Sequence, residues 1–316
     1  MNIGYDIIGD VHGMADALKR LLDKLGYEIS DGVYQHPASR KAIFVGDLID
    51  RGPDNIEVIE IAKSMTEAGN AITIMGNHEL NAIMYFRSDN ENKPIRPHSN
   101  KNKKQHQSFL SEVEDNPLKW RDIIEWFERL PLFYENDDFR VIHACWDDIS
   151  IKKLHPYINK NNSLKSDFIL DAGKIHCELY KIVETLLKGD EQIIPNDGYF
   201  VDKDGNVRKA ARIQWWMDPG TSFKDLAMIP GNKKTVEKYK LNMPNTPPKT
   251  RVFYNDKKPV FIGHYWMKGD LKLQTDFVCC VDYSAGKGDR LCAYRWNPRE
   301  KLTTYNLATV LVEDST

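Results

Sequence analysis

The feature that most constrains the fold is a set of five apolar runs, each of which gives way at once to polar side chains. The runs read IIGDVHG, FVGDLIDRG, IMGNHE, VIHACWD and FIGHYW, and in four of them a Gly separates the two parts. Short apolar runs of this kind are typical of buried strands. Ligand sites in open α/β sheets lie at the carboxyl ends of strands, where neighbouring turns converge. The sequence therefore predicts an α/β fold with a polar site along one sheet edge.

Helical patterns alternate with these runs. The first pattern puts four leucines on one helix face, followed by a Gly stop signal: Leu18, Leu21, Leu22 and Leu25. Further helices are predicted over four ranges: 53–69, 78–86, 117–131 and 174–189. The stretch 132–144 predicts a β-hairpin that turns at Asn136 and Asp137. This alternation favours a layered α/β architecture.

The length of 316 residues allows one large α/β domain or two ordinary ones. We expect a single domain over 1–316, with a polar surface loop at about 89–108. Strand signals are sparse over about 150–250, where the sequence DKDGN at 202–206 predicts a turn. We interpret this stretch as a cap-like insertion over the site and not as a second core. Strand-like runs return after it: PVFIG, FVCCVDY, LCAYRW and LTTYNL.

Composition excludes several classes of protein. The chain is 41% hydrophobic and 28% charged, which is typical of a soluble globular protein. A net charge of −2 gives no global attraction for nucleic acid or for an anionic membrane. No apolar run reaches the ~20 residues of a membrane span, the N-terminus lacks signal-peptide features, and the five cysteines include no CxxC pair. We expect a cytoplasmic protein whose oligomeric state the sequence leaves open.

The polar residues after the five runs have the chemistry of a catalytic metal site. A lone Asp-x-His is more often a turn, and a lone strand His is more often a core residue. Here several carboxylates and imidazoles follow different strands, which favours metal binding. Hard oxygens mixed with imidazoles, without thiolate, suit Mn, Fe or Zn. The candidate ligands are Asp10, His12, Asp47, Asn77, His143 and His264.

These motifs resemble those of the calcineurin-like metallophosphoesterases, and most closely those of their phosphoprotein-phosphatase branch. That branch carries GDxHG, GDxxDRG, GNHE, a strand-borne His and a late GH, and this chain has all of them in that order between Gly9 and His264. The resemblance implies a four-layer α/β/β/α sandwich of mixed sheets flanked by helices. It also implies two divalent metal ions, with Mn the first choice and Fe or Zn as alternatives.

The resemblance further implies a role for each motif residue. Asp10 and His12 would hold the first metal, and Asp47 would bridge the two. The second site would be completed by three further ligands: Asn77, His143 and His264.

His78 would act as the general acid, oriented by Asp50, and Arg51 would bind phosphate oxygens. The charges alone support this arrangement, because three aspartates and one arginine would repel a phosphate dianion until two divalent cations reversed the local sign. Such cations lower the pKa of a bridging water and stabilise the attacking and leaving oxygens.

The pattern departs from the family at two places. Many relatives outside the branch end in GHxH, whereas Trp266 stands at the fourth position here. The branch usually carries a second phosphate-binding Arg in the insertion; Arg212 is the candidate and Arg251 a weaker one. Four further residues are minor candidates for contacting substrate: Trp215, Trp216, Asp282 and Arg290.

The leading functional prediction is hydrolysis of phosphomonoesters, such as phosphoserine or phosphothreonine in proteins. A second reading keeps the metal site and changes the substrate to a dinucleoside polyphosphate, since ester and anhydride hydrolysis need the same groups. A third reading is a non-catalytic phosphate-binding module. The partner expected in each case is a phosphorylated protein or nucleotide.

Overall fold

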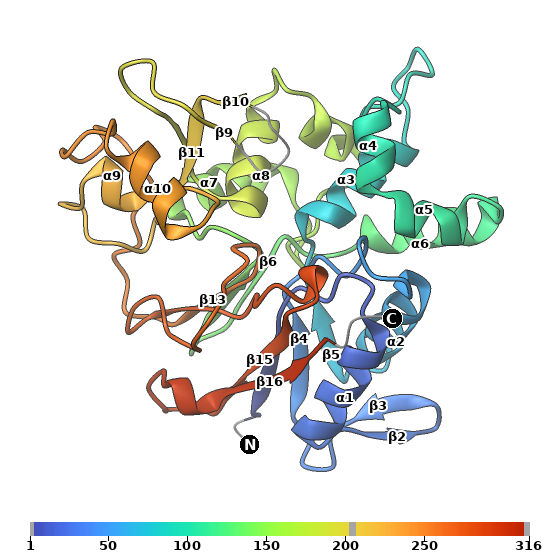
Figure 1. The fold of residues 1–316 in the computed structure, drawn as a ribbon. Coiled ribbons are helices and arrows are strands. Elements are labelled where there is room, and N and C mark those ends of the chain that lie inside the picture. The colour runs from blue at the N-terminus through green and yellow to red at the C-terminus, as the bar shows by residue number, and fades with distance from the viewer. Residues whose placement is uncertain (1–2, 202–206, 313–316) are drawn as a thin grey trace.

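Two mixed sheets form the centre of the protein in the computed structural model, which describes residues 3–201 and 207–312 (Figure 1). The first sheet has the strand order β16-β15-β1-β4-β5. Its strands are β1 (Tyr5–Ile8), β4 (Lys41–Phe44), β5 (Ala71–Thr73), β15 (Arg290–Trp296) and β16 (Leu307–Leu311). The strands β1, β4 and β5 run parallel, while β15 is antiparallel to both β1 and β16.

The second sheet has the order β14-β13-β7-β6. Its strands are β6 (Phe133–Glu135), β7 (Arg140–Ile142), β13 (Val260–Ile262) and β14 (Val278–Cys280). β13 runs parallel to β7 and β14, and β6 is antiparallel to β7. The β6–β7 pair confirms the hairpin predicted for 132–144.

The period of two along each strand explains how the sheets pack. Ile7 and Ile43 belong to a buried cluster that also contains Phe261 from the second sheet. Their neighbours Ile8 and Phe44 point to the opposite face and join the cluster that contains the helices. The first cluster is therefore the core between the two sheets, and helices lie outside. The predicted sandwich of mixed sheets flanked by helices is confirmed.

The helices follow the predicted pattern at most positions. The longer ones are α1 (Ala15–Leu25), α2 (Asn55–Glu67), α3 (Asn77–Phe86), α6 (Pro117–Phe127) and α8 (Glu178–Lys188). The four leucines of α1 are buried, and Gly26 ends the helix in the left-handed conformation. The shorter helices are α4 (Asn100–Gln105), α5 (Gln107–Val113), α7 (Asp148–Leu154), α9 (Phe223–Leu226) and α10 (Lys233–Lys240).

Single 3₁₀ turns and one small hairpin complete the main body. The 3₁₀ turns are η1 (His155–Tyr157), η2 (Ser166–Phe168), η3 (Leu170–Gly173), η4 (Ala285–Lys287) and η5 (Thr304–Asn306). The hairpin consists of β2 (Glu28–Ser30) and β3 (Val33–Gln35). None of the helices in the described ranges combines the length and the apolar character that a membrane crossing needs.

The range 89–108, expected to be a polar loop, differs in part from that expectation. It contains α4, whose N-terminus is capped by the Ser99 side chain. It also contains His106, which is only 1% exposed. Polar composition predicted a solvated segment, but this imidazole is covered by long-range contacts that composition does not reveal.

The insertion at about 150–250 contains more strands than its sequence indicates. They are β8 (Glu191–Ile193), β9 (Phe200–Val201), β10 (Val207–Arg208), β11 (Ala210–Ile213) and β12 (Ala227–Met228). A separate small buried cluster, including Phe200, Ile213 and Phe223, lies among them, which the sequence did not indicate. Strands of two to four residues are too short to show a clear alternation. The turn predicted at 202–206 lies outside the described residues.

Candidate metal centre

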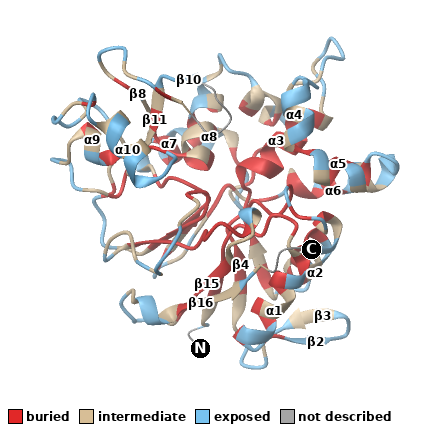
Figure 2. Cartoon of the chain, viewed as in Figure 1, coloured by how far each residue is buried: buried red, intermediate tan, exposed pale blue. Residues whose placement is uncertain are grey.

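The turns that follow the central strands are buried and conformationally unusual. Figure 2 shows the buried colour continuing from the sheets into the turns at the centre of the view. Several non-glycine residues there adopt left-handed backbone: His12, Asp47, Asp50, Arg51, His264 and Trp266. Such conformations are costly for residues with a Cβ, and they cluster where function requires a defined geometry.

Two of these turns approach each other so closely that they need glycine. Gly46 has φ +93°, and a Cβ on it would lie 2.3 Å from the backbone nitrogen of Gly76. A Cβ on Gly76 would in turn lie 2.4 Å from Oδ1 of Asp47. The glycines of the strand-end motifs therefore bring the turns after β4 and β5 together around one carboxylate.

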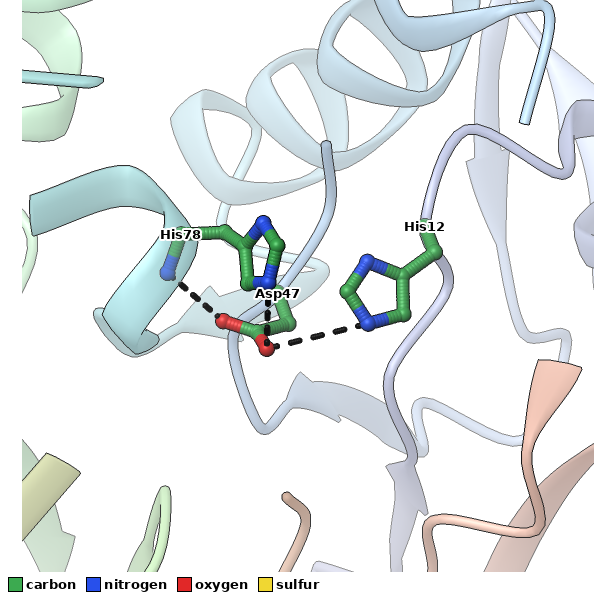
Figure 3. Close-up of side chains that lie close together, drawn as sticks. All are labelled: His12, Asp47 and His78. Atoms are coloured by element: carbon green, nitrogen blue, oxygen red, sulfur yellow. Dashed lines mark hydrogen bonds and ion pairs between the residues drawn. The ribbon is translucent and has the colours of Figure 1, made fainter. Parts of the chain in front are cut away.

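Asp47 lies at the centre of the cluster. Its Oδ2 is 3.7 Å from Nε2 of His12 and 3.9 Å from Nε2 of His78, and the three side chains point toward one another (Figure 3). Its Oδ1 is 3.4 Å from Nε2 of His143 and accepts the backbone N–H of His78 at 2.9 Å. The sequence thus folds so that one carboxylate faces imidazoles from three different turns.

Backbone carbonyls set the orientation of two of these rings. Nδ1 of His12 donates to the carbonyl of Ile49 at 2.8 Å, and Nδ1 of His143 donates to that of Val45 at 2.7 Å. With the proton on Nδ1, each Nε2 presents its lone pair to the centre. This arrangement is the usual one for histidines that ligate a metal.

The remaining candidate ligands lie beside this group. The Asn77 side-chain oxygen is 3.2 Å from Nε2 of His143, and the rings of His143 and His264 are 5.1 Å apart. Both oxygens of Asp10 accept the backbone N–H of His264, at 3.2 and 3.0 Å. The structure therefore brings all six sequence-predicted ligands to one region.

The donor set fits two cations. Three groups of side chains have ligand atoms within 4.8 Å of one another, and two of these groups share Asp47: His12, Asp47 and His78, and Asp47, His143 and His264. Nε2 of His12 and both ring nitrogens of His264 are buried and have no hydrogen-bond partner in the described part of the chain. Buried polar atoms normally have partners, and cations would provide them. Asp10 belongs to none of these groups, since its oxygens face the His264 backbone. The ligand roles of all six residues stay predictions.

The pKa shifts in the cluster are those expected where buried carboxylates and neutral imidazoles face one another, an arrangement that cations would stabilise. Burial, then Asp282 and Asp47, raise the pKa of Asp10 well above its usual value. Burial alone would raise the pKa of Asp47 too, but the surrounding histidines, His143 first, hold it well below its usual value. Burial and then His78 lower the pKa of His12 to about 3, so this ring stays neutral and able to ligate.

Glu79 is a functional residue for which the sequence suggested no role, although it ends the GNHE motif. Its carboxylate accepts three backbone N–H groups, from Asp47 at 2.8 Å, Leu48 at 2.8 Å and Gly76 at 2.9 Å. Glu79 is fully buried. It therefore ties the turn after β4 to the start of α3 and fixes the backbone that carries Asp47.

His78 and Asp50 form the pair that the sequence predicted. Nδ1 of His78 donates to Oδ2 of Asp50 at 2.5 Å. Burial tends to raise the pKa of Asp50, but hydrogen bonds from His106 and His78 lower it to about 2. Burial likewise tends to lower the pKa of His78, and the negative charges of Asp47 and Asp50 outweigh that effect. His106 is the second residue that sequence reasoning missed, because a polar segment carries it.

Arg51 is exposed and lies over an aromatic ring. Its guanidinium carbon is 3.9 Å from the centroid of Trp266, the residue that replaces the second His of GHxH. Nζ of Lys287 lies 3.1 Å from the same centroid. The cluster of candidate ligands thus has basic groups beside it on an aromatic support, which suits a phosphate.

The structure separates the two arginine candidates of the insertion. The charge of Arg212 is, after burial, the largest cause that lowers the pKa of His264. Nε of Arg212 is buried and has no hydrogen-bond partner within residues 3–201 and 207–312. Arg251 instead donates to the backbone carbonyls of Met217 and Asp218. Arg212 is therefore the one that lies near the cluster.

The minor candidates have mostly structural contacts. Trp215 is fully buried and donates to the Ala144 carbonyl at 3.0 Å, and Trp216 is 5% exposed, so both belong to the core. Asp282 accepts the backbone N–H of Trp266 at 2.6 Å and holds that turn. Arg290 pairs with its neighbour Asp289.

Comparison with known proteins gives three findings. The family model of the calcineurin-like phosphoesterases matches residues 5–194. The asymmetrical bis(5′-nucleosyl)-tetraphosphatase PrpE of Oceanobacillus iheyensis is 40% identical over 139 residues, which are 44% of this chain and 54% of that protein. PrpE of Halalkalibacterium halodurans is 53% identical over 74 residues, which are 23% of this chain and 30% of that protein. The chain thus spans about half the length, or less, of these two relatives.

A solved structure of a cold-active protein-tyrosine phosphatase from a psychrophilic Shewanella species matches along the whole chain. The alignment covers 99% of this chain and 81% of that one, with a TM-score of 0.51 and 14% identity. A likeness at this identity concerns the fold alone.

Proposed function

The chain belongs to the calcineurin-like phosphoesterase family, and on that premise we propose that it is a phosphoester hydrolase that uses two divalent cations. The observation that carries the proposal is the position of Asp47 between two groups of imidazoles whose free nitrogens are buried. The proposed ligands are Asp10, His12, Asp47, Asn77, His143 and His264. Mn is the proposed metal, with Fe or Zn as alternatives.

Bound divalent cations would activate a water and stabilise the attacking and leaving oxygens of a phosphoryl group. The side chains of this chain supply the rest. Arg51 binds two phosphate oxygens with its planar fork, and Arg212 contributes a second positive charge. His78, held by Asp50, protonates the departing oxygen, a step typically worth about 10²- to 10⁴-fold in rate.

We propose phosphomonoesters as substrates, including phosphoserine and phosphothreonine in proteins. Dinucleoside polyphosphates are the second candidate, and the names of the relatives favour it, since both are bis(5′-nucleosyl)-tetraphosphatases. The insertion is the part of the chain that would distinguish the two substrates, because a cap over the site would decide which leaving group fits. The five cysteines are free thiols, which fits work in the reducing cytoplasm.

The test is a comparison of substrates with metal-stripped protein supplied in turn with Mn²⁺, Fe²⁺ and Zn²⁺. An aryl phosphate, a phosphoserine peptide and diadenosine tetraphosphate would be assayed with the wild type and with Asp47→Asn. We expect phosphate release from the first two substrates, with loss of turnover in the variant. Preferential cleavage of diadenosine tetraphosphate would select the second candidate. Phosphate binding without turnover on any substrate would contradict the proposal and favour a binding module.

A further inference from the structure

His106 forms a hydrogen bond with Asp50 that no sequence motif predicted. Its Nδ1 lies 2.8 Å from Oδ2 of Asp50, the same oxygen that receives Nδ1 of His78 at 2.5 Å. The side chains of His106 and Asp50 are 1% and 0% exposed. Two imidazoles from different parts of the chain therefore converge on one buried oxygen.

The hydrogen-bond chemistry defines the state of both rings. An ionised carboxylate only accepts hydrogen bonds, so each imidazole carries a proton on Nδ1. As the general acid, His78 carries a second proton on Nε2 and gives that one to the leaving oxygen, while its Nδ1–H stays bonded to Asp50. Nε2 of His78 is then the atom that faces the candidate metal centre, 3.9 Å from Oδ2 of Asp47. The Nδ1 atoms of His78 and His106 lie 2.5 and 2.8 Å from Oδ2 of Asp50. These are hydrogen-bond distances and are too short for a shared metal ion, because ligands about 2.0–2.2 Å from a tetrahedral ion are more than about 3 Å apart.

Two helices determine where His106 lies. Its N–H bonds back to the carbonyls at the end of α4, and its carbonyl accepts the N–H of Leu110 in α5. Phe109 and Val113 bury one face of α5 in the main core. The ring of His106 also lies 5.8 Å from that of Tyr85 on α3. Its position is therefore set by packing and not by a free loop.

The remaining contacts of Asp50 leave its carboxylate dependent on these two rings. The Asp50 backbone N–H donates to the Asn55 side chain at 2.6 Å, which fixes the main chain. Oδ1 of Asp50 is buried without a hydrogen-bond partner among the described residues. The direction of the carboxylate thus depends on the two hydrogen bonds that Oδ2 accepts from His78 and His106.

We propose that His106 is a positioning residue, which holds Asp50 and through it aims Nε2 of His78 at the oxygen of the leaving group. The proposal rests on the proposed function, because it assigns His106 to the same reaction. A general acid misplaced by about 1 Å can lose on the order of 10²-fold in rate. The segment 89–108 then contributes to catalysis through one buried imidazole.

The test uses the leaving group as its readout. A phosphoester with an acidic leaving group departs without a proton, whereas one with a basic leaving group needs the general acid. The full chain with Mn²⁺ would be assayed on aryl phosphates of increasing leaving-group pKa. The variants are His106→Leu, which removes the donor, and His106→Asn, whose amide N–H replaces Nδ1–H.

A matched control comes from the same segment. His98 stacks on Tyr85 with ring centroids 3.8 Å apart and bonds to the Tyr85 carbonyl at 2.8 Å. His98→Leu therefore loosens the segment without touching Asp50. Thermal unfolding and bound metal would be measured for every variant, and His106→Asn keeps the test decisive if His106→Leu fails to fold.

We expect His106→Leu to lower kcat about 10- to 100-fold on the most basic leaving groups and far less on p-nitrophenyl phosphate, with KM little changed. His106→Asn should restore most of kcat, and His98→Leu should show no dependence on the leaving group. An equal loss for all leaving groups, or equal damage from Asn and Leu, would overturn the role of His106 alone. A wild type without turnover on any phosphoester would overturn the proposed function as well.

Discussion

The backbone N–H of His264 donates to the carboxylate of Asp10 at 3.0 Å, although 254 positions of sequence separate the two residues. The turn after β13 in the second sheet thereby meets the turn after β1 in the first. Both residues are buried. The candidate metal centre is therefore assembled across the two sheets, and it depends on how closely they approach.

Gly263→Ala tests that close approach. A Cβ on Gly263 would lie 2.1 Å from Oδ1 of Asp10, so alanine must displace the carboxylate. We expect a loss of about 1–3 kcal/mol in unfolding free energy, as for other overpacked sites, together with weaker metal binding. Urea denaturation and Mn²⁺ titration would measure the two effects. The control is the exposed Gly220→Ala, and equal effects in both variants would contradict the explanation.

Trp266→Ala tests the support of Arg51. The guanidinium lies 3.9 Å from the ring centroid, and such contacts are worth about 0.5–2 kcal/mol. We expect KM for an aryl phosphate to rise about 2- to 30-fold, with a smaller change in kcat. Trp266→Phe retains an aromatic face and should behave almost as the wild type. A fall in kcat at constant KM would show that Trp266 acts in another way.

Asp6→Ala tests a buried charge network near the start of β1, whereas the candidate metal centre follows the end of that strand. The carboxylate of Asp6 is 0% exposed and accepts from Nε of Arg40 and Nε of Arg295, both at 3.0 Å. Removing it leaves two guanidinium groups without their buried partner, so we expect a loss of about 3–5 kcal/mol by urea unfolding. Asp16→Ala breaks an exposed pair with Lys19 and should change stability little. Equal stability of the two variants would refute this ranking.

The ion pairs of Glu135 should make part of the stability of the fold sensitive to acid. Burial tends to raise its pKa, but hydrogen bonds from Lys258 and Arg140 outweigh burial and hold the pKa below its ordinary value of 4.5. The ionised side chain therefore stabilises the folded state above pH 4.5, and this contribution fades as the pH falls through the lowered value. The urea midpoint of Glu135→Gln should lie below that of the wild type at pH 7 and approach it in acid. A gap that is independent of pH would contradict the prediction.

Much of the fold could be predicted because its main elements have regular apolar patterns, on one face in the helices and along the whole run in the central strands. The leucine spacing of α1 and the apolar runs of β1, β4 and β13 each report a local contact with the core. The strands of the insertion could not be predicted, since elements such as β12 have two residues and show no period.

The candidate site likewise has residues that the sequence predicted and residues that it did not. Polar residues directly after strands marked the cluster around Asp47, because strand ends meet at one edge of a sheet. His106 gave no such signal, since its burial comes from α4 and α5 folding back onto Asp50. The three hydrogen bonds of Glu79 to the backbone and the stacking of Arg51 on Trp266 are likewise tertiary contacts.

The most direct measurement of the central claim is the number of Mn²⁺ ions that the protein binds, determined by elemental analysis and equilibrium titration. The proteins compared are the wild type, Asp47→Ala, His264→Ala and the exposed control His155→Ala. The account predicts about two equivalents in the wild type and in the control. It predicts about one tight equivalent in His264→Ala and the weakest binding in Asp47→Ala, whose carboxylate faces both groups of imidazoles. Unchanged binding in Asp47→Ala, or less than one equivalent in the wild type, would contradict it.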